Sequence, residues 1–119
     1  MKYYTRKLIK TSDLNGRGTL FGGRLLEWID EEAAIFAFCQ ADSRHLVTKA
    51  MSEVNFVSPV MNGDIIEFGC DLLGIGNTSI SVKLEVRNKT TKKKVVEVDK
   101  ITFVNLDKFG MPKKIGTWM

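Results

Sequence analysis

The chain has 119 residues, of which 44% are hydrophobic and 27% charged, and its formal net charge is +4 at pH 7. This length predicts a single domain, 1–119, and the composition is that of a soluble globular protein and argues against a disordered chain. No apolar run approaches the roughly 18 residues of a membrane span. The first residues lack the apolar core of a secretory signal, so we expect a cytoplasmic protein that does not associate with membranes.

The sequence predicts one strand, one long helix and then four strands. Weak alternation over 3–10 predicts a strand, and a polar loop that contains glycine follows over 11–18. Apolar residues at helical spacing predict a helix over 22–40. Further strands are expected over 47–57, 65–73, 79–87 and 95–106, and the tail 107–119 is expected to be loosely ordered.

One helix followed by strands in meander-like order predicts an α+β fold. The helix is expected to cover one face of an antiparallel sheet. The other face must then meet solvent or a partner. Because the edge strands are long, association of two sheets into a dimer is favoured.

Two glycines at the start of the predicted helix are candidates for binding a carbonyl group. Gly22 and Gly23 lie where backbone N–H groups have no partner within the helix. Since glycine has no Cβ, a ligand can approach this backbone closely. Such donors suit a carbonyl oxygen that gains negative charge during a reaction. The structural alternative is a tight turn into the helix.

One acid of the predicted helix is expected to differ from its neighbours. Glu27 and Glu31 share a polar stripe with Arg24 and form favourable charge pairs with it. Asp30 falls instead toward the small residues of the helix, which the core is expected to cover. Burial of a carboxylate is costly and makes it a stronger base. The alternative is a structural aspartate bonded to nearby backbone.

The remaining candidates are weaker. Glu32 is expected to face solvent, Asn15 before Gly16 is typical of a routine turn, and His45 is interpreted as a loop histidine. Cys39 and Cys70 form neither a disulfide framework nor a zinc pattern. The chain has no phosphate-binding loop, dinucleotide fingerprint or nucleophile elbow.

Six basic residues give the second half its excess positive charge. They either meet an anionic ligand or nucleic acid, or belong to a solvated edge strand and turn. No aromatic residue lies among them, which argues against nucleic acid. The six are Lys83, Arg87, Lys89, Lys92, Lys93 and Lys94.

A longer motif spans the loop and the helix start. It consists of Asn15, Gly18-Thr19-Leu20-Phe21-Gly22-Gly23, Leu25-Leu26 and Trp28-Ile29-Asp30-Glu31. This motif resembles the signature of hotdog-fold acyl-CoA thioesterases. Val47-Thr48, Asn55-Phe56-Val57-Ser58-Pro59-Val60 and Gly76-Asn77-Thr78-Ser79-Ile80 extend the similarity, which covers roughly residues 5–106. Many hotdog enzymes have histidine where this chain has Phe21, so no histidine role is assigned.

The resemblance implies a hotdog fold, in which a long antiparallel sheet wraps around one central helix. It implies hydrolysis of acyl-CoA to a carboxylic acid and CoA, in homodimers with shared active sites that assemble into tetramers or hexamers. No metal or cofactor is implied, because CoA is part of substrate and product. Carried over by motif, Asp30 is the general base or nucleophile, Asn15 comes from the opposite subunit, and Gly22 and Gly23 bind the thioester carbonyl.

The CoA arm is expected to use a strand, a turn and a basic residue. An extended pantetheine would run along residues 54–58, and the phosphates need backbone donors or cations. The candidate CoA-binding residues are Asn55, Val57, Asn77, Thr78, Ser79 and Arg87.

A binding function stays open alongside hydrolysis, whereas a dehydratase is disfavoured. A non-catalytic acyl-CoA-binding domain would need neither Asn15 nor Asp30, so the presence of both favours the enzyme. A dehydratase would pair a histidine with an acid, and His45 lacks that context. Acyl-carrier-protein thioesters remain an alternative substrate.

Overall fold

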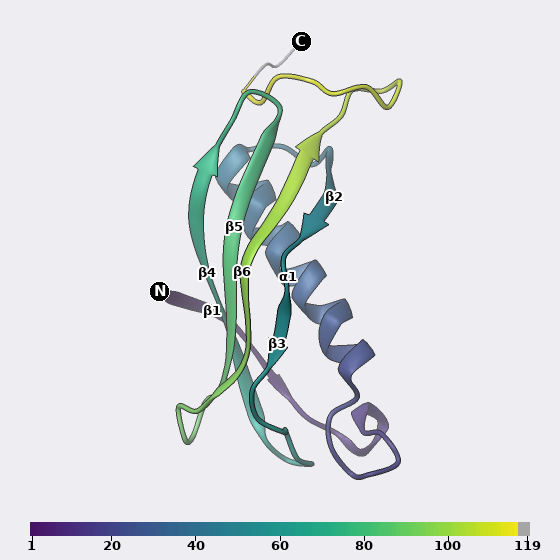
Figure 1. Ribbon diagram of the computed structural model, residues 1–119, viewed down its shortest axis with the longest axis vertical. Coiled ribbons are helices and arrows are strands. Elements are labelled where there is room, and N and C mark those ends of the chain that lie inside the picture. The colour runs from purple at the N-terminus through teal and green to yellow at the C-terminus, as the bar shows by residue number, and fades with distance from the viewer. Residues whose placement is uncertain (117–119) are drawn as a thin grey trace.

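The computed structural model describes residues 1–116, which form one antiparallel sheet and one long helix (Figure 1). The sheet has six strands in the order β1-β4-β5-β6-β2, and β3 pairs with β6 beside β2. In chain order the elements are β1 (Lys2–Leu8), the short 3-10 helix η1 (Thr11–Asp13), α1 (Gly22–Ala41), β2 (Leu46–Met51), β3 (Val54–Phe56), β4 (Ile65–Ile75), β5 (Ser79–Asn88) and β6 (Lys94–Asn105).

Helix α1 lies lengthwise across one face of the sheet, so the predicted α+β class is confirmed (Figure 1). Its core-facing side carries Ala33 and Ala37, both fully buried. Because alanine adds only a methyl group to the backbone, strands approach this part of the helix closely. The arrangement is the long sheet around one helix that the family resemblance implies.

The inner face of the sheet is continuous and apolar. On β5, Ile80, Val82, Leu84 and Val86 are fully buried and alternate with half-buried polar residues of the outer face. This is the period-two pattern of a strand covered on one side. The alternation predicted for 79–87 is therefore confirmed, with one more residue at its C-terminal end.

The meander-like order predicted for the last four strands is wrong for the first of them. Strands β4, β5 and β6 follow one another in the sheet, but β2 and β3 pair with β6 and not with β4. The predicted single strand 47–57 is interrupted at Ser52, whose N–H donates to the Lys100 carbonyl at 2.8 Å. Both segments, β2 and β3, pair with β6, and they form an edge of the sheet next to α1 (Figure 1).

The segment after β6 returns across the end of the sheet. The Lys113 N–H donates to the Asn105 carbonyl, and the Ile115 N–H donates to the Asn77 carbonyl, at 2.8 and 2.9 Å. These bonds fix part of the tail that was expected to be loosely ordered; residues 117–119 lie outside the described residues. Over residues 1–116, no helix combines the length and the apolar character required to cross a membrane.

Candidate active site

The loop before α1 is fixed by a buried aspartate. Asp13 accepts the Lys10 N–H through Oδ2 at 2.9 Å, and its Oδ1 lies 3.7 Å from Arg24 Nε in the first turn of α1. The Phe21 N–H donates to the Asp13 carbonyl at 2.9 Å. Arg24 therefore ties the helix to the loop, and the charge pairs predicted between Arg24 and the acids of its stripe are replaced by this contact.

The first two residues of α1 present unpaired amide groups. Within the described chain, helical hydrogen bonding starts with Arg24 and Leu25, whose N–H groups donate to the Phe21 carbonyl. The N–H groups of Gly22 and Gly23 have no acceptor there, as expected for the first turn of a helix. They are available to an oxygen that approaches along the helix axis.

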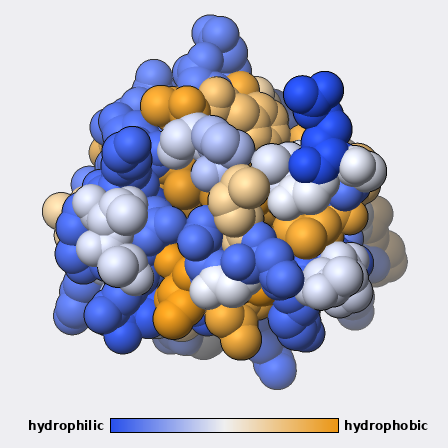
Figure 2. Space-filling model, turned by 90° about the horizontal axis from the view of Figure 1, so that it is seen from below, coloured by the Kyte–Doolittle hydropathy of each residue, from blue (hydrophilic) through white to orange (hydrophobic). Residues whose placement is uncertain are grey.

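Two phenylalanine rings border these glycines. A Cβ placed on Gly23 would lie 2.9 Å from Phe21 Cε2, whereas a Cβ on Gly22 would meet only the Phe56 ring, at 3.9 Å. Beside Gly22 is an apolar cavity of about 220 Å³. Its walls are Leu20, Gly22, Leu25, Phe56, Val57, Ser58, Pro59, Val60 and Val95. Seen from this end, the surface shows apolar patches among hydrophilic groups (Figure 2).

Asp30 lies two turns further along α1 and is held by a threonine of β2. Thr48 Oγ1 donates to Asp30 Oδ1 at 2.7 Å. Asp30 is half-buried rather than covered by the core. Its Oδ2 accepts no hydrogen bond from residues 1–116, so it is open to a ligand or water. Sequence reasoning missed Thr48 as a site residue, although it lies in the strand segment that was matched after the helix.

Asn15 organises its own loop. Its Oδ1 accepts the N–H groups of Arg17 and Thr19 at 2.9 and 3.2 Å, and its Nδ2 donates to Thr19 Oγ1 at 3.0 Å. The turn interpretation is therefore correct for the local role of Asn15. One N–H of its amide remains uncommitted within the described chain.

A single chain does not bring these groups to one point. Eight residues of α1, about 12 Å at 1.5 Å per residue, separate Gly22 from Asp30. The Asn15 loop lies beyond the N-terminus of α1 (Figure 1). Gly22, Gly23 and Asn15 thus form one group at the helix start, and Asp30 with Thr48 forms another beside the β2 edge.

The expectation that Glu32 faces solvent is wrong. Glu32 is only 9% exposed and accepts a hydrogen bond from Thr5 of β1 at 3.2 Å. The reason is helical geometry: Leu25 and Ile29 are buried, and Glu32 follows Ile29 by three residues on the same face. Asp30 points toward β2, at the other edge of the sheet from β1.

The predicted CoA-binding residues lie in separate places. Asn77, Thr78 and Ser79 occupy the turn between β4 and β5, whereas Arg87 is at the other end of β5, roughly 26 Å away at 3.3 Å per residue. The structure does not bring them together. Asn55 and Val57 are exposed at and just after β3, near the cavity at the helix start.

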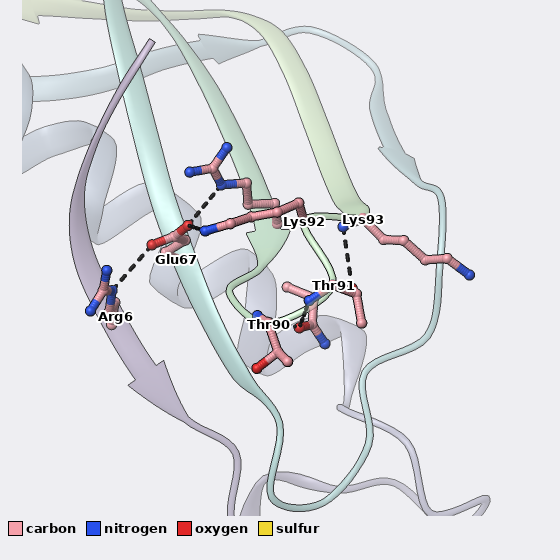
Figure 3. A network of polar contacts seen from close by, with 8 residues as sticks. Arg6, Glu67, Thr90, Thr91, Lys92 and Lys93 are labelled. Carbon is pink, nitrogen blue, oxygen red and sulfur yellow. Dashed lines mark hydrogen bonds and ion pairs between the residues drawn. The ribbon is translucent and has the colours of Figure 1, made fainter.

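Arg87 belongs to a charge cluster around Glu67 on the outer face of the sheet. Figure 3 labels Glu67, Arg6 and Lys92 of this cluster. The carboxylate of Glu67, 3% exposed, accepts hydrogen bonds from Arg87 Nε at 2.7 Å and Arg6 Nε at 3.1 Å, and Lys92 Nζ lies 3.5 Å away. The Arg87 guanidinium also lies 3.7 Å from the centre of the Tyr3 ring. Burial alone raises the pKa of Glu67, but the hydrogen bonds from Arg87 and Arg6 outweigh it and hold that pKa below its usual value.

The other basic residues of this face are also largely paired. Lys83 and Lys94 lie 3.3 and 3.0 Å from Glu97, and Lys94 lies 3.7 Å from Glu85. These contacts favour a solvated, paired surface over an open anion-binding patch. The expected edge strand is wrong, however, because β5 lies between β4 and β6 in the sheet; only the turn of the prediction, which carries Lys89, Lys92 and Lys93, is confirmed. Within residues 1–116, no three histidine, cysteine or acidic side chains come together in a group able to hold a metal ion. His45 is exposed in the loop before β2, as predicted.

Comparison with known proteins places this geometry in context. Residues 17–95 match the family model of the thioesterase superfamily. An uncharacterized acyl-CoA thioester hydrolase of Bacillus subtilis is 32% identical over 114 residues, which are 89% of this chain and 66% of that protein. The chain therefore spans just under two thirds of the length of that relative.

Two solved structures are similar over nearly the whole chain. A hexameric broad-specificity acyl-coenzyme A thioesterase, solved as an aspartate-to-alanine mutant, superposes with a TM-score of 0.87 at 30% identity, over 98% of this chain and 88% of that chain. An acyl-CoA hydrolase of Staphylococcus aureus in complex with butyryl coenzyme A, coenzyme A and coenzyme A disulfide gives a TM-score of 0.84 at 32% identity, over 96% of this chain and 68% of that chain. The likeness thus extends far beyond the motif at the helix start.

Proposed function

The chain belongs to the thioesterase superfamily and has its hotdog fold, and we propose that it hydrolyses acyl-CoA to a free carboxylic acid and CoA. One observation carries the proposal: α1 begins with two unpaired amides and, two turns later, presents a carboxylate held by Thr48 with one oxygen open. Thioester hydrolysis needs both a stabiliser of the carbonyl oxygen and a base or nucleophile.

The proposed chemistry assigns each group one task. The N–H groups of Gly22 and Gly23 bind the thioester carbonyl oxygen and stabilise the charge that grows on it as an oxygen attacks. Asp30 acts either as the base that takes a proton from the attacking water or as the nucleophile that forms an anhydride, which water then cleaves. The carbon–sulfur bond breaks, and the CoA sulfur leaves with the electron pair and then takes up a proton.

We further propose that two subunits complete each site. Since about 12 Å of helix separates Gly22 from Asp30 within one chain, both cannot reach one carbonyl carbon. The open edge formed by β2 lies beside Asp30, and pairing of two such edges in a dimer would bring a second chain to it. In this arrangement Asn15, Gly22 and Gly23 of one subunit face Asp30 and Thr48 of its partner. Assembly to a hexamer, as in the solved acyl-CoA thioesterase, is part of the same proposal.

The substrate arm is assigned from the positions of cavity, strand and turn. The apolar cavity of about 220 Å³ beside Gly22 would hold the part of the substrate next to the thioester. Pantetheine would pass Asn55 and Val57, which are exposed. Asn77, Thr78 and Ser79 lie at the other end of the sheet, because Ser79 pairs with Val104 whereas Asn55 pairs with Glu97. They would therefore bind CoA phosphates only from another subunit. We leave Arg87 out of this set because its guanidinium is committed to Glu67 and Tyr3.

The test is release of free thiol from a series of acyl-CoAs, from acetyl to palmitoyl. Wild type is expected to release thiol, and Asp30→Asn is expected to lose turnover by several orders of magnitude, because the amide neither accepts a proton nor attacks. Glu31→Gln, which changes the adjacent exposed acid, is the matched control and should keep wild-type turnover. Label from heavy-oxygen water in the Asp30 carboxyl after turnover would identify the nucleophile.

The same assay separates hydrolysis from binding alone. If no acyl-CoA releases thiol while CoA still raises the unfolding temperature, the chain is the non-catalytic acyl-CoA-binding domain. Turnover only of thioesters on acyl carrier protein would keep the chemistry and change the substrate. Near-normal turnover by Asp30→Asn would remove Asp30 from the mechanism.

A further inference from the structure

A second cavity lies on the side of α1 that faces away from Asp30. It has a volume of about 140 Å³ and lies between α1 and the strands β1 and β4. This is below the roughly 300–1,000 Å³ of sites for drug-sized ligands, so it suits a smaller molecule. Its walls include the aromatic rings of Tyr4, Phe36 and Phe68, and those of Tyr4 and Phe36 are 5.5 Å apart.

Glu32 places a carboxylate in this apolar wall. The side chain lines the cavity, and its Oε2 accepts the Thr5 hydroxyl at 3.2 Å. Its other oxygen, Oε1, has no protein partner within residues 1–116. Because every fully buried side-chain oxygen in that part of the chain has a partner, Oε1 is accessible, and the space that Glu32 lines is this cavity.

No cation of the described chain neutralises this carboxylate. The ion pairs of residues 1–116 involve Asp13, Glu67, Glu85 and Glu97 and leave Glu32 out. Lys2 lies over the ring of Tyr4, with Nζ 5.7 Å from its centre, and forms no ion pair with Glu32. The charge of Glu32 is felt inside the cavity, where burial first, and Glu32 and Asp71 next, raise the pKa of the Cys70 thiol to about 12.

A buried carboxylate without a cation is costly, because the single Thr5 hydroxyl replaces only part of the water it has lost. A cation that entered the cavity would relieve this cost, and aromatic rings attract an ammonium group through their electron-rich faces. The carboxylate and the aromatic rings therefore favour the same kind of ligand. Its positively charged nitrogen would lie near Glu32, and its small apolar group would pack against the rings.

We propose that this cavity binds a small organic ammonium ion, with Glu32 as its counter-ion and Tyr4, Phe36 and Phe68 as its apolar wall. The site is separate from the proposed thioesterase site, since Glu32 bonds to β1 and Asp30 bonds to β2, at opposite edges of the sheet. Binding is therefore measurable without acyl-CoA and without turnover.

The test is calorimetric titration of the full chain, in its native assembly, with benzylammonium chloride at constant ionic strength. Benzyl alcohol and benzoate are the neutral and anionic probes of matching shape. Wild type should bind benzylammonium saturably and the other two at least roughly tenfold more weakly. Glu32→Gln, which keeps shape and removes charge, should weaken benzylammonium binding by a similar factor, while Glu31→Gln should leave it unchanged.

Two further measurements keep the test decisive. Thermal unfolding of Glu32→Gln without ligand should show a folded protein at least as stable as wild type, because a lone buried charge has been removed. Thr5→Val, which removes the hydroxyl and keeps the carboxylate, should still bind benzylammonium. The proposal is overturned if wild type does not bind benzylammonium saturably or if benzyl alcohol binds equally well. It is also overturned if folded Glu32→Gln binds benzylammonium as tightly as wild type, or if folded Thr5→Val does not bind it.

Discussion

At the scale of single residues, the chemistry of α1 depends on which neighbour each acid meets. Asp30 and Glu32 are two positions apart and point to opposite edges of the sheet, where Thr48 and Thr5 respectively donate to them. One acid is half-buried with an open oxygen at the proposed thioesterase site, and the other is buried in a separate cavity. Residue type alone does not distinguish them; their direction from the helix axis does.

Thr48→Val tests the role of the threonine that holds Asp30. The substitution keeps the shape and removes the hydroxyl that donates at 2.7 Å. Loss of a hydrogen bond to a charged group corresponds to roughly a 10- to 100-fold fall in kcat. Because Thr48 positions Asp30 and is assigned no contact with CoA, KM should change little. Thr48→Ser, which restores the hydroxyl, should recover most of the rate, and equal rates for Val and Ser would rule out the positioning role.

Glu67→Gln tests the charge cluster of the outer face. The amide cannot balance Arg6, Arg87 and Lys92, so we expect a loss of about 1–3 kcal/mol in the free energy of unfolding at neutral pH. The folded-state pKa of Glu67 is lowered, so its contribution is present above the unfolded pKa of about 4.3 and is lost as the pH falls through the lower, folded value.

Chemical unfolding across pH measures this contribution. Wild type should lose its advantage over Glu67→Gln progressively below about pH 4.3. Glu97→Gln is the control for the removal of a less buried carboxylate. Glu97 also pairs with two lysines, Lys83 and Lys94, but it is more exposed than Glu67. A stability difference between wild type and Glu67→Gln that stays constant down to strong acid would show that the carboxylate charge is not responsible.

Among the elements of the fold, the start of α1 matters most to the proposed activity, because the substrate carbonyl would bind there. Gly22→Ala tests whether a close approach to its backbone is needed. A Cβ there would meet only the Phe56 ring, at 3.9 Å, which is an ordinary contact, so the fold should hold. The methyl group would occupy space beside the proposed carbonyl site, and displacement of the substrate by about 1 Å can cost roughly 100-fold in kcat/KM. Gly16→Ala, with open space around its Cβ, should have wild-type activity and stability.

The secondary structure was largely predictable because it depends on local periodicity. The helix expected over 22–40 is α1, which extends by one residue, and the strand expected over 95–106 is β6 within one residue at each end. Hydrogen bonding between segments that are distant in the sequence was harder to predict. Nothing in residues 47–57 identifies β6 as their neighbour, and the interruption at Ser52 depends on its bonds with Lys100.

The residues of the candidate site could be proposed from the motif, but the contacts between them could not. The motif pointed to Asp30, Gly22 and Gly23, and it did so from one continuous segment. Thr48 was missed because its role depends on β2 passing beside α1. Glu32 was assigned the wrong face because the helix was divided into a polar stripe and a small-residue side, although the spacing from Ile29 to Glu32 continues the buried face.

At the scale of the whole molecule, one chain contains two incomplete halves of the proposed site. Asn15, Gly22 and Gly23 lie at one end of α1, and Asp30 with Thr48 lies further along it beside the open β2 edge. A second copy that pairs at this edge would supply the missing half to each chain. The proposed activity is therefore a property of the assembly, and subunits with different defects should rescue one another.

The most direct measurement is thiol release from an acyl-CoA by a mixture of Asn15→Ala and Asp30→Ala subunits after confirmed exchange. Each variant alone should be nearly inactive. Statistical mixing makes half of the dimers mixed, and each mixed dimer has one intact site of two, so about a quarter of wild-type activity should return. Recovery near that level supports hydrolysis at a site shared between subunits. Absence of recovery, or substantial activity in Asp30→Ala alone, would contradict it.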